Sequence, residues 1–159
     1  MKSNDRRTFQ HSIAMKKIVA LLIACCALLQ TRAAEPEWLT DVPAALARAK
    51  ADNKTVLLDF TGSDWCGWCI KFKKEALDTP EFQEFAAKNL VLVELDFPRK
   101  KPQSADLKEA NKALGQKYNI TGYPTFVFLN KDGKEIGRQE GYEPGGAKAF
   151  IDKINGFKK

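Results

Sequence analysis

The stretch VLLDFTGSDWCGWC, residues 56–69, joins a short apolar run to two cysteines three positions apart. The run at 56–60 starts with a β-branched residue and is interrupted only by Asp59, which predicts a buried β-strand. We expect a helix over residues 66–76, so that Cys66 and Cys69 lie on one face of its first turn, close enough to form a disulfide. The sequence therefore predicts a cysteine pair at the end of a buried strand.

The position of the pair at a helix N-terminus has a chemical consequence. The unpaired N–H groups and the positive end of the helix dipole favour the thiolate form of Cys66 over the thiol. A cysteine pKa of about 8.5 falls to roughly 7 or below in such motifs. Cys69, one turn further along, is expected to be more buried and less acidic. This asymmetry favours thiol–disulfide exchange, in which Cys66 attacks a partner disulfide and Cys69 resolves the mixed disulfide.

Other uses of the two cysteines fit the composition less well. Apart from Cys25, Cys26 and His11, which precede residue 34, the chain has no cysteine beyond the pair and no histidine. A zinc site needs four ligands, and copper delivery is disfavoured by so few sulfur and imidazole ligands. A purely structural disulfide closing so short a loop constrains little of the unfolded chain. We therefore expect a redox-active disulfide, with no metal and no other cofactor.

Outside this segment, the chain alternates strand and helix signals. Asp41 and Ser104 are predicted helix N-caps, and Thr79 with Pro80 restarts the helix that follows the cysteines. Asp132-Gly133 is a strong hairpin signal. The expected helices span about 44–50, 66–76, 104–118 and 144–157, and the expected strands 56–60, 90–97, 125–130 and 135–139.

This order predicts a small α/β fold with a central mixed sheet of about four to five strands and helices on both faces. Strands separated by helices are expected to pair in parallel, and the final hairpin adds an antiparallel edge. The sequence has no repeat and no low-complexity tract, so we expect one folded domain.

Residues 1–33 differ in composition from the rest of the chain. Lys16 and Lys17 precede an unbroken run of 12 apolar residues, IVALLIACCALL at 18–29, and small residues follow it. This pattern is typical of a secretory signal peptide, and the run is too short to span a bilayer core, which takes about 20 residues. We expect cleavage after Ala33, which leaves residues 34–159 as the exported domain in a periplasmic or secreted location.

Three alternatives for this leader remain open. Met15 is a second candidate start, because it opens a complete signal peptide by itself. The sequence DRRTF at 5–9 resembles a twin-arginine export signal. The sequence LIAC at 22–25 resembles a bacterial lipobox, which would make Cys25 a lipidated N-terminus. Only in that last case do we expect a membrane partner.

Most of the excess positive charge lies in the leader. The formal net charge is +6, but residues 1–34 hold six of the 26 basic residues and one of the 20 acidic ones. The remainder carries 20 bases against 19 acids, which is too close to neutral for the basic footprint of a nucleic-acid binder. We therefore expect no nucleic-acid partner.

Two motifs give the chain a family resemblance. The stretch at 56–69 resembles the active-site segment of the thioredoxin superfamily, and TGYPT at 121–125 is similar to its cis-proline loop. The resemblance covers residues 38–157 and is greatest to secreted bacterial thioredoxin-like proteins and to the thioredoxin-like domain of thiol:disulfide interchange proteins. It implies a thioredoxin-like fold and a thiol:disulfide oxidoreductase.

Carried over to this sequence, the resemblance implies roles for five residues. Cys66 would be the nucleophile and Cys69 the resolving thiol. Asp59 would be the buried acid that handles the proton of the resolving cysteine, with burial raising its pKa; the alternative is that its carboxyl only bonds to local backbone. Pro124 would be the cis-proline facing the pair, next to Tyr123, whose backbone would pair with an extended substrate strand.

Three more residues around the pair are expected to contact substrate. Trp65 precedes the nucleophile and either forms part of the exposed rim or packs beside the helix. Gly67 and Trp68 lie between the cysteines. In the superfamily, the position of Trp68 holds proline in thioredoxins and histidine in disulfide isomerases. The missing histidine favours a reductant or a general oxidoreductase.

The sequence departs from the superfamily pattern at two other positions. Asp59 lies seven residues before Cys66, where six are usual, so we expect a bulge at Gly62-Ser63 that re-aims the carboxyl. Lys73 stands where the interchange domain has a glutamate, so no help from an acid is expected there.

The predicted function is a secreted thiol–disulfide oxidoreductase. Its partners would be protein thiols and disulfides and an upstream electron donor or acceptor protein, and we expect it to be a monomer. The alternative is a non-catalytic binding module with the same fold, in which Cys66 and Cys69 form a structural disulfide. The intact pair at a helix N-terminus favours catalysis.

Overall fold

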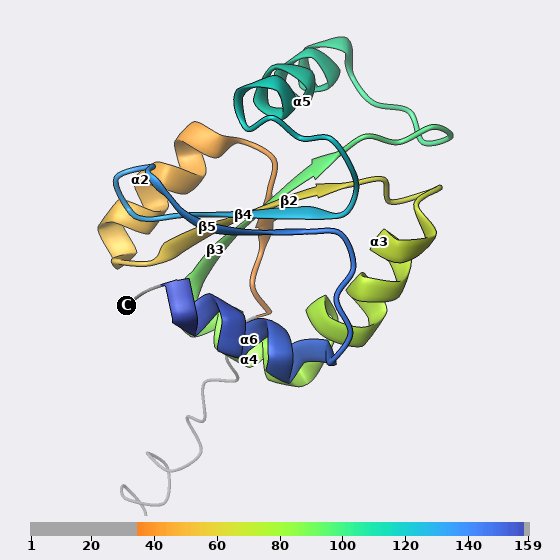
Figure 1. Ribbon diagram of the computed structural model, residues 1–159. Coiled ribbons are helices and arrows are strands. Elements are labelled where there is room, and N and C mark those ends of the chain that lie inside the picture. The colour runs from red at the N-terminus through yellow and green to blue at the C-terminus, as the bar shows by residue number, and fades with distance from the viewer. Residues whose placement is uncertain (1–34, 158–159) are drawn as a thin grey trace, which may run out of the picture. The chain divides into compact units, whose positions relative to one another are not determined.

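The computed structural model describes residues 35–157, which fold into a sheet flanked by helices (Figure 1). In chain order the elements are β1 (Trp38–Leu39), α2 (Val42–Asp52), β2 (Thr55–Thr61), α3 (Gly67–Phe72), the π-helix η1 (Lys73–Leu77), α4 (Pro80–Asn89), β3 (Leu90–Asp96), α5 (Ala105–Lys117), β4 (Thr125–Leu129), β5 (Glu135–Glu140) and α6 (Gly146–Phe157). The predicted signal peptide, the second start at Met15 and the twin-arginine and lipobox motifs lie outside the described residues.

The strands form one mixed sheet in the order β1-β3-β2-β4-β5. β1 and β2 pair with β3 in parallel, whereas β4 pairs with β2, and β5 with β4, in antiparallel orientation. Figure 1 shows α5 on one side of the sheet and α4 and α6 packed together on the other. The predicted α/β fold, with a mixed sheet and helices on both faces, is confirmed.

The sheet differs from the sequence-based prediction in two respects. β1 is missing from the prediction, because two residues are too few to show a hydrophobic period. β4 is antiparallel to β2, although a helix precedes it. The reason is that α5 is held at the end of β3, where the Asn111 amide donates to the Asp96 carbonyl at 2.9 Å. The chain therefore re-enters the sheet at the end where β2 stops, so that Thr125 pairs with Phe60.

Local sequence signals explain where three helices and the hairpin begin. Asp41, Thr79 and Ser104 each precede a helix, and the side-chain oxygen of each accepts the backbone N–H three residues on, at 2.7, 3.3 and 3.3 Å. These bonds satisfy N–H groups that the first turn of a helix leaves without a partner. The predicted hairpin joins β4 to β5, with Gly133 at a φ of 80° that favours glycine. All four predictions are confirmed.

The sheet buries a different apolar cluster on each face, because successive side chains of a strand point to opposite sides. On one face, Leu57 lies in a cluster rich in phenylalanine, formed with α3, α4, α6 and β4: Phe72, Phe82, Phe126, Phe128 and Phe150. On the other face, Val56, Leu58 and Phe60 pack with residues of α2. Asp59 follows Leu57 by two positions and therefore belongs to the phenylalanine-rich face.

Candidate active site

The turn between β2 and α3 carries the chain from the sheet to Cys66. β2 keeps its parallel register with β3 as far as Thr61, so the predicted bulge at Gly62-Ser63 is wrong. The extra residue is accommodated in the turn, where the Gly62 carbonyl accepts the backbone N–H groups of Trp65 at 3.2 Å and Cys66 at 2.9 Å. A bulge would interrupt the pairing of β2 with its neighbours, whereas a turn takes up one more residue and leaves the strand pairing intact.

Trp65 packs tightly within this turn. A Cβ added to Gly62 would lie only 2.6–2.8 Å from the Trp65 indole, so this close approach requires glycine. The indole Nε1 donates to the Phe97 carbonyl at 2.8 Å. The ring of Tyr123 meets the indole edge-on, with centroids 5.8 Å apart, and the Arg99 guanidinium lies 3.8 Å from the indole ring centre. Trp65 is therefore half-buried and packed, but against the loops that contain Phe97 and Tyr123 and not beside the helix.

Asp64 ties the same turn to the loop that follows β3. Its carboxylate accepts the backbone N–H groups of residues 99–101 at 2.7–3.0 Å. The bond from Arg99, together with those from the next two residues, lowers the pKa of Asp64 to about 2. Ser63 adds a second link, since its backbone N–H and hydroxyl both donate to the carboxylate of Asp96 at 2.9 and 2.6 Å. The segment leading to Cys66 is therefore held at several points.

Cys66 and Cys69 form a disulfide at the first turn of α3, with Cα atoms 5.2 Å apart. Cys66 is the N-cap of the helix, and its sulfur accepts the backbone N–H of Cys69 at 3.2 Å. The helix N-terminus thus presents a donor to the sulfur of Cys66, as stabilisation of a thiolate requires. The two cysteines are 7% and 4% exposed, so the expected difference in burial is small. Gly67 between them is exposed, with open space where a Cβ would stand.

A pocket of about 290 Å³ lies beside Cys69 and contains Asp59. Its lining residues come from β1, β2, β3, the turn, α3 and η1: Trp38, Asp59, Thr61, Ser63, Cys69, Ile70, Lys73, Leu77 and Glu94. Asp59 is 6% exposed, and its Oδ1 atom has no hydrogen-bond partner among residues 35–157. The local backbone therefore leaves this oxygen unsatisfied, in the same pocket as the predicted resolving cysteine.

The electrostatic surroundings of Asp59 favour its protonated form. Burial raises the pKa of Asp59 well above 3.8, and the negative charges of Glu94 and Asp96 raise it further. The positive charge of Lys73 acts in the opposite direction. Burial, followed by the charge of Asp96, also raises the pKa of Glu94. A carboxyl with a raised pKa is suited to exchange a proton with a thiol near neutral pH.

Glu94 is a pocket residue that the sequence analysis missed. It is half-buried on β3 and pairs in parallel register with Asp59 on β2. The family resemblance places an acid on the helix, at the position that Lys73 holds in this chain. Here the acid comes instead from the neighbouring strand. The register of β2 and β3 brings Glu94 beside Asp59 although they are 35 positions apart in the sequence, so no local sequence pattern predicts the contact.

The loop before β4 lies beside the turn that leads to the disulfide. The peptide bond between Tyr123 and Pro124 is cis, which confirms that part of the prediction. Pro124 is buried, and its carbonyl accepts the backbone N–H of Gly141 at 2.8 Å. The ring contact between Tyr123 and Trp65 joins the loop to the residue before Cys66.

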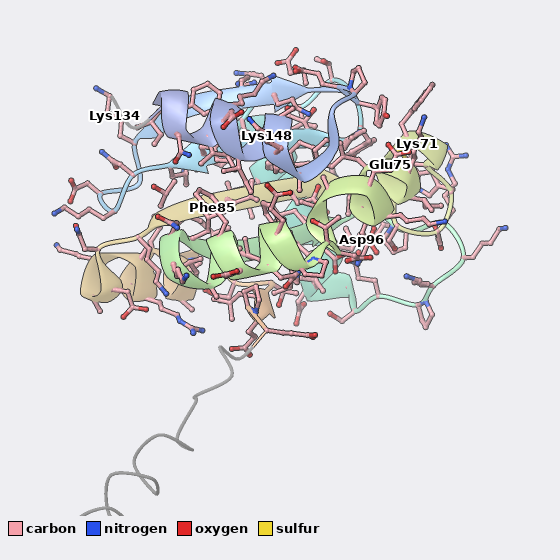
Figure 2. All side chains as sticks on the ribbon, turned by 90° about the horizontal axis from the view of Figure 1, so that it is seen from below. Lys71, Glu75, Phe85, Asp96, Lys134 and Lys148 are labelled. Atoms are coloured by element: carbon pink, nitrogen blue, oxygen red, sulfur yellow. A yellow bond between two sulfur atoms is a disulfide. The ribbon has the colours of Figure 1, made fainter. Side chains whose placement is uncertain are left out.

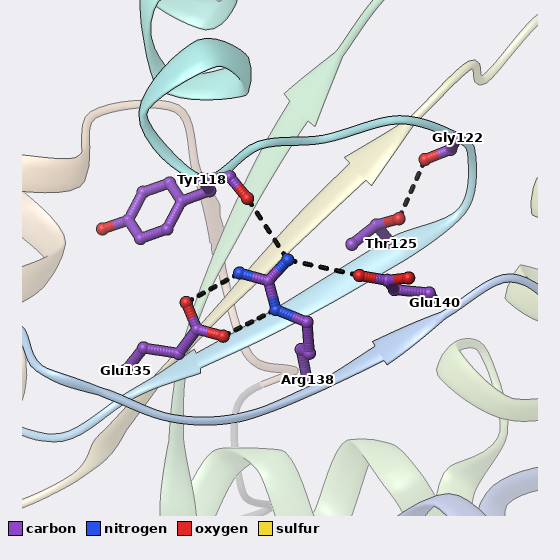
Figure 3. A network of polar contacts seen from close by, with 6 residues as sticks. All are labelled: Tyr118, Gly122, Thr125, Glu135, Arg138 and Glu140. Atoms are coloured by element: carbon purple, nitrogen blue, oxygen red, sulfur yellow. Dashed lines mark hydrogen bonds and ion pairs between the residues drawn. The ribbon is translucent and has the colours of Figure 1, made fainter.

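Arg138 on β5 anchors the beginning of this loop (Figure 3). Its guanidinium donates to both carboxylate oxygens of Glu135, at 2.6 and 2.9 Å, and to Glu140 at 3.3 Å. It also donates to the carbonyl of Tyr118, the C-cap of α5, at 3.2 Å. At the other end of the loop, the Thr125 hydroxyl donates to a loop carbonyl at 2.8 Å. The sequence analysis assigned no role to Arg138, which acts through contacts distant in sequence.

An aromatic surface lies next to the disulfide on α3. Trp68 is 57% exposed and stacks on Tyr142 with ring centroids 5.0 Å apart. The Lys71 ammonium lies 5.5 and 4.7 Å from the centres of these two rings. The Tyr142 hydroxyl donates to Glu75 at 2.8 Å, and Figure 2 shows Lys71 and Glu75 close together beyond the end of α6. Tyr142, to which the sequence suggests no function, therefore supports the exposed face of Trp68.

Within residues 35–157, no group of three or more histidine, cysteine, aspartate or glutamate side chains is arranged to hold a metal ion. None of the helices in this range combines the length and the apolar character needed to cross a bilayer.

Known proteins are similar to this chain over most of its length. A family model described as a thioredoxin-like domain matches residues 42–155. The disulfide bond reductase DsbH of Chlamydia pneumoniae is 40% identical over 146 residues, which cover 84% of this chain and 87% of that protein. A solved structure of a DsbH oxidoreductase, 41% identical, has a TM-score of 0.73 and covers 82% of this chain and 91% of its own.

The predicted likeness to interchange proteins is also found. The thiol:disulfide interchange protein DsbD of Vibrio cholerae serotype O1 is 33% identical over 98 residues. That match covers 62% of this chain but only 15% of DsbD, so it concerns a small part of a much longer protein.

Proposed function

The chain belongs to the thioredoxin-like domain family, and on that premise we propose that it reduces disulfides in exported proteins. It is a thiol:disulfide oxidoreductase. The observation that carries the proposal is the joint placement of the two cysteines, with Cys66 capping α3 and Cys69 sharing a pocket with the buried Asp59.

The first step is an attack by Cys66 in the reduced protein. Its thiolate, stabilised by the N–H groups at the start of α3, forms a bond to one sulfur of the substrate disulfide. The substrate S–S bond breaks, and the other substrate sulfur leaves as a thiolate that takes a proton from water. The product is a mixed disulfide between Cys66 and the substrate.

The second step releases the substrate and uses Cys69 and Asp59. The Cys69 thiol gives its proton to the Asp59 carboxylate, and the resulting thiolate attacks the Cys66 sulfur. The substrate leaves as a second thiolate, and the Cys66–Cys69 disulfide forms. Two electrons have passed to the substrate, and Asp59 now holds a proton, in agreement with the direction in which its surroundings shift its pKa.

Substrate binding falls to the residues around the pair. The backbone at Tyr123, next to cis-Pro124, would pair with an extended substrate segment. Trp68 offers a large exposed apolar surface beside Cys66, and the exposed Gly67 leaves room for the approaching chain. Trp65 supports this surface from its packed position instead of forming a free rim.

Reduction is the favoured direction of electron flow. Trp68 stands between the cysteines where an oxidant or isomerase would carry histidine, so no imidazolium stabilises the Cys66 thiolate there. The relative that matches over most of both chains is itself named a disulfide bond reductase. A reductant must be re-reduced, so an upstream dithiol protein supplies two electrons after each turnover.

The site of action would be outside the cytoplasm, because the sequence at 16–33 has the pattern of a signal peptide. There the protein would act as a monomer on protein disulfides, without a metal or another cofactor. Thiol chemistry in such a compartment has to be maintained by dedicated donors.

The reduction potential of the Cys66–Cys69 pair tests this proposal. The protein is equilibrated with glutathione and dithiothreitol buffers, and its fraction reduced is read by alkylation of free thiols. In parallel, reduction of insulin is followed with dithiothreitol as electron donor. We expect a potential near that of thioredoxin, about −270 mV, and catalysed insulin reduction.

Three results contradict the proposal in different ways. A potential near −120 mV would make the protein an oxidant. A potential below about −300 mV, or a pair that does not exchange, would make the disulfide structural and favour the binding module. Failure to reduce insulin together with a potential near −270 mV would mean that this protein does not reduce general protein disulfides.

A further inference from the structure

The pocket beside Cys69 contains a second acid whose place in the fold suggests a function. Glu94 and Asp59 are register partners on adjacent parallel strands, so their side chains leave the sheet on the same face. Both line the pocket that also contains Cys69. Side chains directly opposite one another on neighbouring strands lie close together, and like charges at such positions repel.

The charges around Asp59 are unevenly distributed. From β3, Glu94 and Asp96 contribute negative charge, and from η1, Lys73 contributes positive charge. On its other side Asp59 pairs with Phe126 of β4, which carries no charge. Two of these charged groups have other partners: Lys73 is ion-paired with Asp78, and the carboxylate of Asp96 accepts a hydrogen bond from the Ser63 hydroxyl. Glu94 forms no ion pair within the described part of the chain. The positive charge of Lys101 also acts on Glu94 and favours its ionised form.

Asp59 and Glu94 differ in their exposure to solvent and in their hydrogen bonding. Asp59 is 6% exposed and has an unpartnered carboxyl oxygen, whereas Glu94 is only half-buried. The group closer to solvent is the easier one to ionise, because water stabilises its charge. One proton shared within the pocket therefore resides on Asp59, while Glu94 carries the negative charge.

We infer that Glu94 is a positioning residue that acts through Asp59: from the neighbouring strand of the same pocket, its carboxylate places a negative charge beside the carboxyl that receives the proton of Cys69. The inference rests on the proposed function, in which Asp59 accepts that proton. When an electron donor re-reduces the protein, its thiolate bonds to Cys66, the S–S bond breaks, and the leaving Cys69 thiolate takes the proton back from Asp59. Lys73 opposes the effect of Glu94 from the other wall of the pocket.

Paired charge-removing variants test the inference in the oxidised protein. The midpoint at which the Asp59 carboxyl titrates is measured from its 13C chemical shift, with Asp59→Asn identifying the signal. Glu94→Gln should lower the midpoint by about one pH unit, and Lys73→Gln should raise it. Glu94→Asp, which keeps the charge, should stay close to wild type, and Glu84→Gln on α4 is the matched control at an exposed position.

A second readout links the titration to catalysis. The resolving step is measured by rapid mixing as release of substrate from the Cys66 mixed disulfide. Because this step uses Asp59 as the carboxylate, its rate should rise at lower pH in Glu94→Gln than in wild type, and it should level off at a lower value because a weaker base accepts the proton of Cys69 less readily. A merely structural role for Glu94 would change stability without moving either pH profile. An unchanged or raised Asp59 midpoint in Glu94→Gln overturns the inference, as does a lowered midpoint that leaves the resolving step unaltered.

The wild-type protein provides a measurement that does not depend on the variant folding. If the two carboxyls are coupled, the Asp59 signal also responds at the pH where Glu94 titrates. Two independent titration curves would overturn the inference. Because the titrations use the oxidised protein without substrate, they stand even if insulin reduction fails, so failure of the proposed function and failure of this inference are distinguishable.

Discussion

Leu57 and Asp59 lie two residues apart on the same strand and the same face of the sheet, and both are buried. Leu57 belongs to a cluster whose phenylalanine rings meet one another at 4.7–5.8 Å. Asp59 instead lines a pocket and has a carboxyl oxygen without a partner. We call the first region the phenylalanine cluster and the second the Asp59 pocket.

The difference shows how one face of a sheet separates stability from chemistry. Burying a large apolar side chain contributes about 1.5–3 kcal/mol, whereas leaving a polar group buried without a bond costs about 1–3 kcal/mol. The Asp59 pocket therefore gives up stability in order to keep a proton-accepting group beside Cys69. Mutations in the two regions should consequently have opposite signatures.

The largest effect is expected from the cysteines next to the Asp59 pocket. Cys66→Ser should abolish thiol–disulfide exchange, because the attacking thiolate is removed. Cys69→Ser should instead accumulate a mixed disulfide with substrate, visible on non-reducing gels and by mass spectrometry. Neither change should alter the fold, as seen by circular dichroism. Normal turnover of a protein disulfide by Cys69→Ser would contradict the two-cysteine mechanism.

In the phenylalanine cluster, Phe150→Ala should cost about 3–5 kcal/mol of unfolding free energy. Phe150 is 2% exposed, and its ring contacts those of Phe72, Phe82, Phe126 and Phe128, so its removal leaves a cavity. Urea unfolding of the oxidised protein measures the loss. While the variant remains folded, the pH profile of its exchange reaction should match that of wild type; a shifted profile would mean that the two regions are not separate.

Asp59→Asn should have the opposite signature, with activity lost and stability gained. The resolving step should slow on the order of 100-fold, because general-base assistance is removed. At pH 7 the oxidised variant should be more stable than wild type, because the asparagine amide is neutral in the buried pocket without having to take up a proton. Stopped-flow kinetics and urea unfolding measure the two effects.

The pH dependence of that gain follows from the raised pKa of Asp59. Between the unfolded value, about 3.9, and the higher folded value, the folded protein holds a proton that the unfolded chain has lost. Wild-type stability therefore falls as the pH rises from about 4 through the folded pKa, and Asp59→Asn lacks this fall. The gain should vanish below about pH 4; a gain that persists there would assign it to packing.

The smallest effect is expected at Asp64, in the turn that supports the pocket. Its pKa is lowered to about 2, so its carboxylate stabilises the folded state above the unfolded value of about 3.9 and loses this effect as the pH falls towards 2. Asp64→Asn should lower the urea midpoint slightly at pH 7 and match wild type near pH 2. Asp132→Asn, an exposed hairpin residue, is the control, and an equal loss at both pH values would contradict the electrostatic origin.

Short-range patterns predicted most of the fold. The apolar run of β2 and the capping residues Asp41, Thr79 and Ser104 each depend on neighbours within a few positions, and the structure confirms them. Errors arose where a distant contact intervened. The antiparallel entry of β4 depends on how α5 is held at the end of β3, and the turn at 62–66 takes up a residue that the spacing to Asp59 suggested would form a bulge.

The same distinction holds for the candidate site: local features were predicted, and features that depend on distant segments were not. The cysteine pair at a helix start is a local feature, because a helix brings residues three apart onto one face and its N-terminus favours a thiolate. The cis peptide before Pro124 followed from a recognisable motif. Whether Trp65 packs or is exposed could not be read from its neighbours, since Phe97, Arg99 and Tyr123 decide it from other segments.

By itself, the sequence determined the element types, the helix starts, the hairpin and the identity of the redox pair, because these depend on propensities and contacts within one turn or strand. Only the tertiary structure decided what surrounds the pair. Strand register sets Glu94 beside Asp59, and chain packing stacks Tyr142 on Trp68. Burial and charge at Asp59 are sums over groups from several elements, so they exist only once the chain has folded.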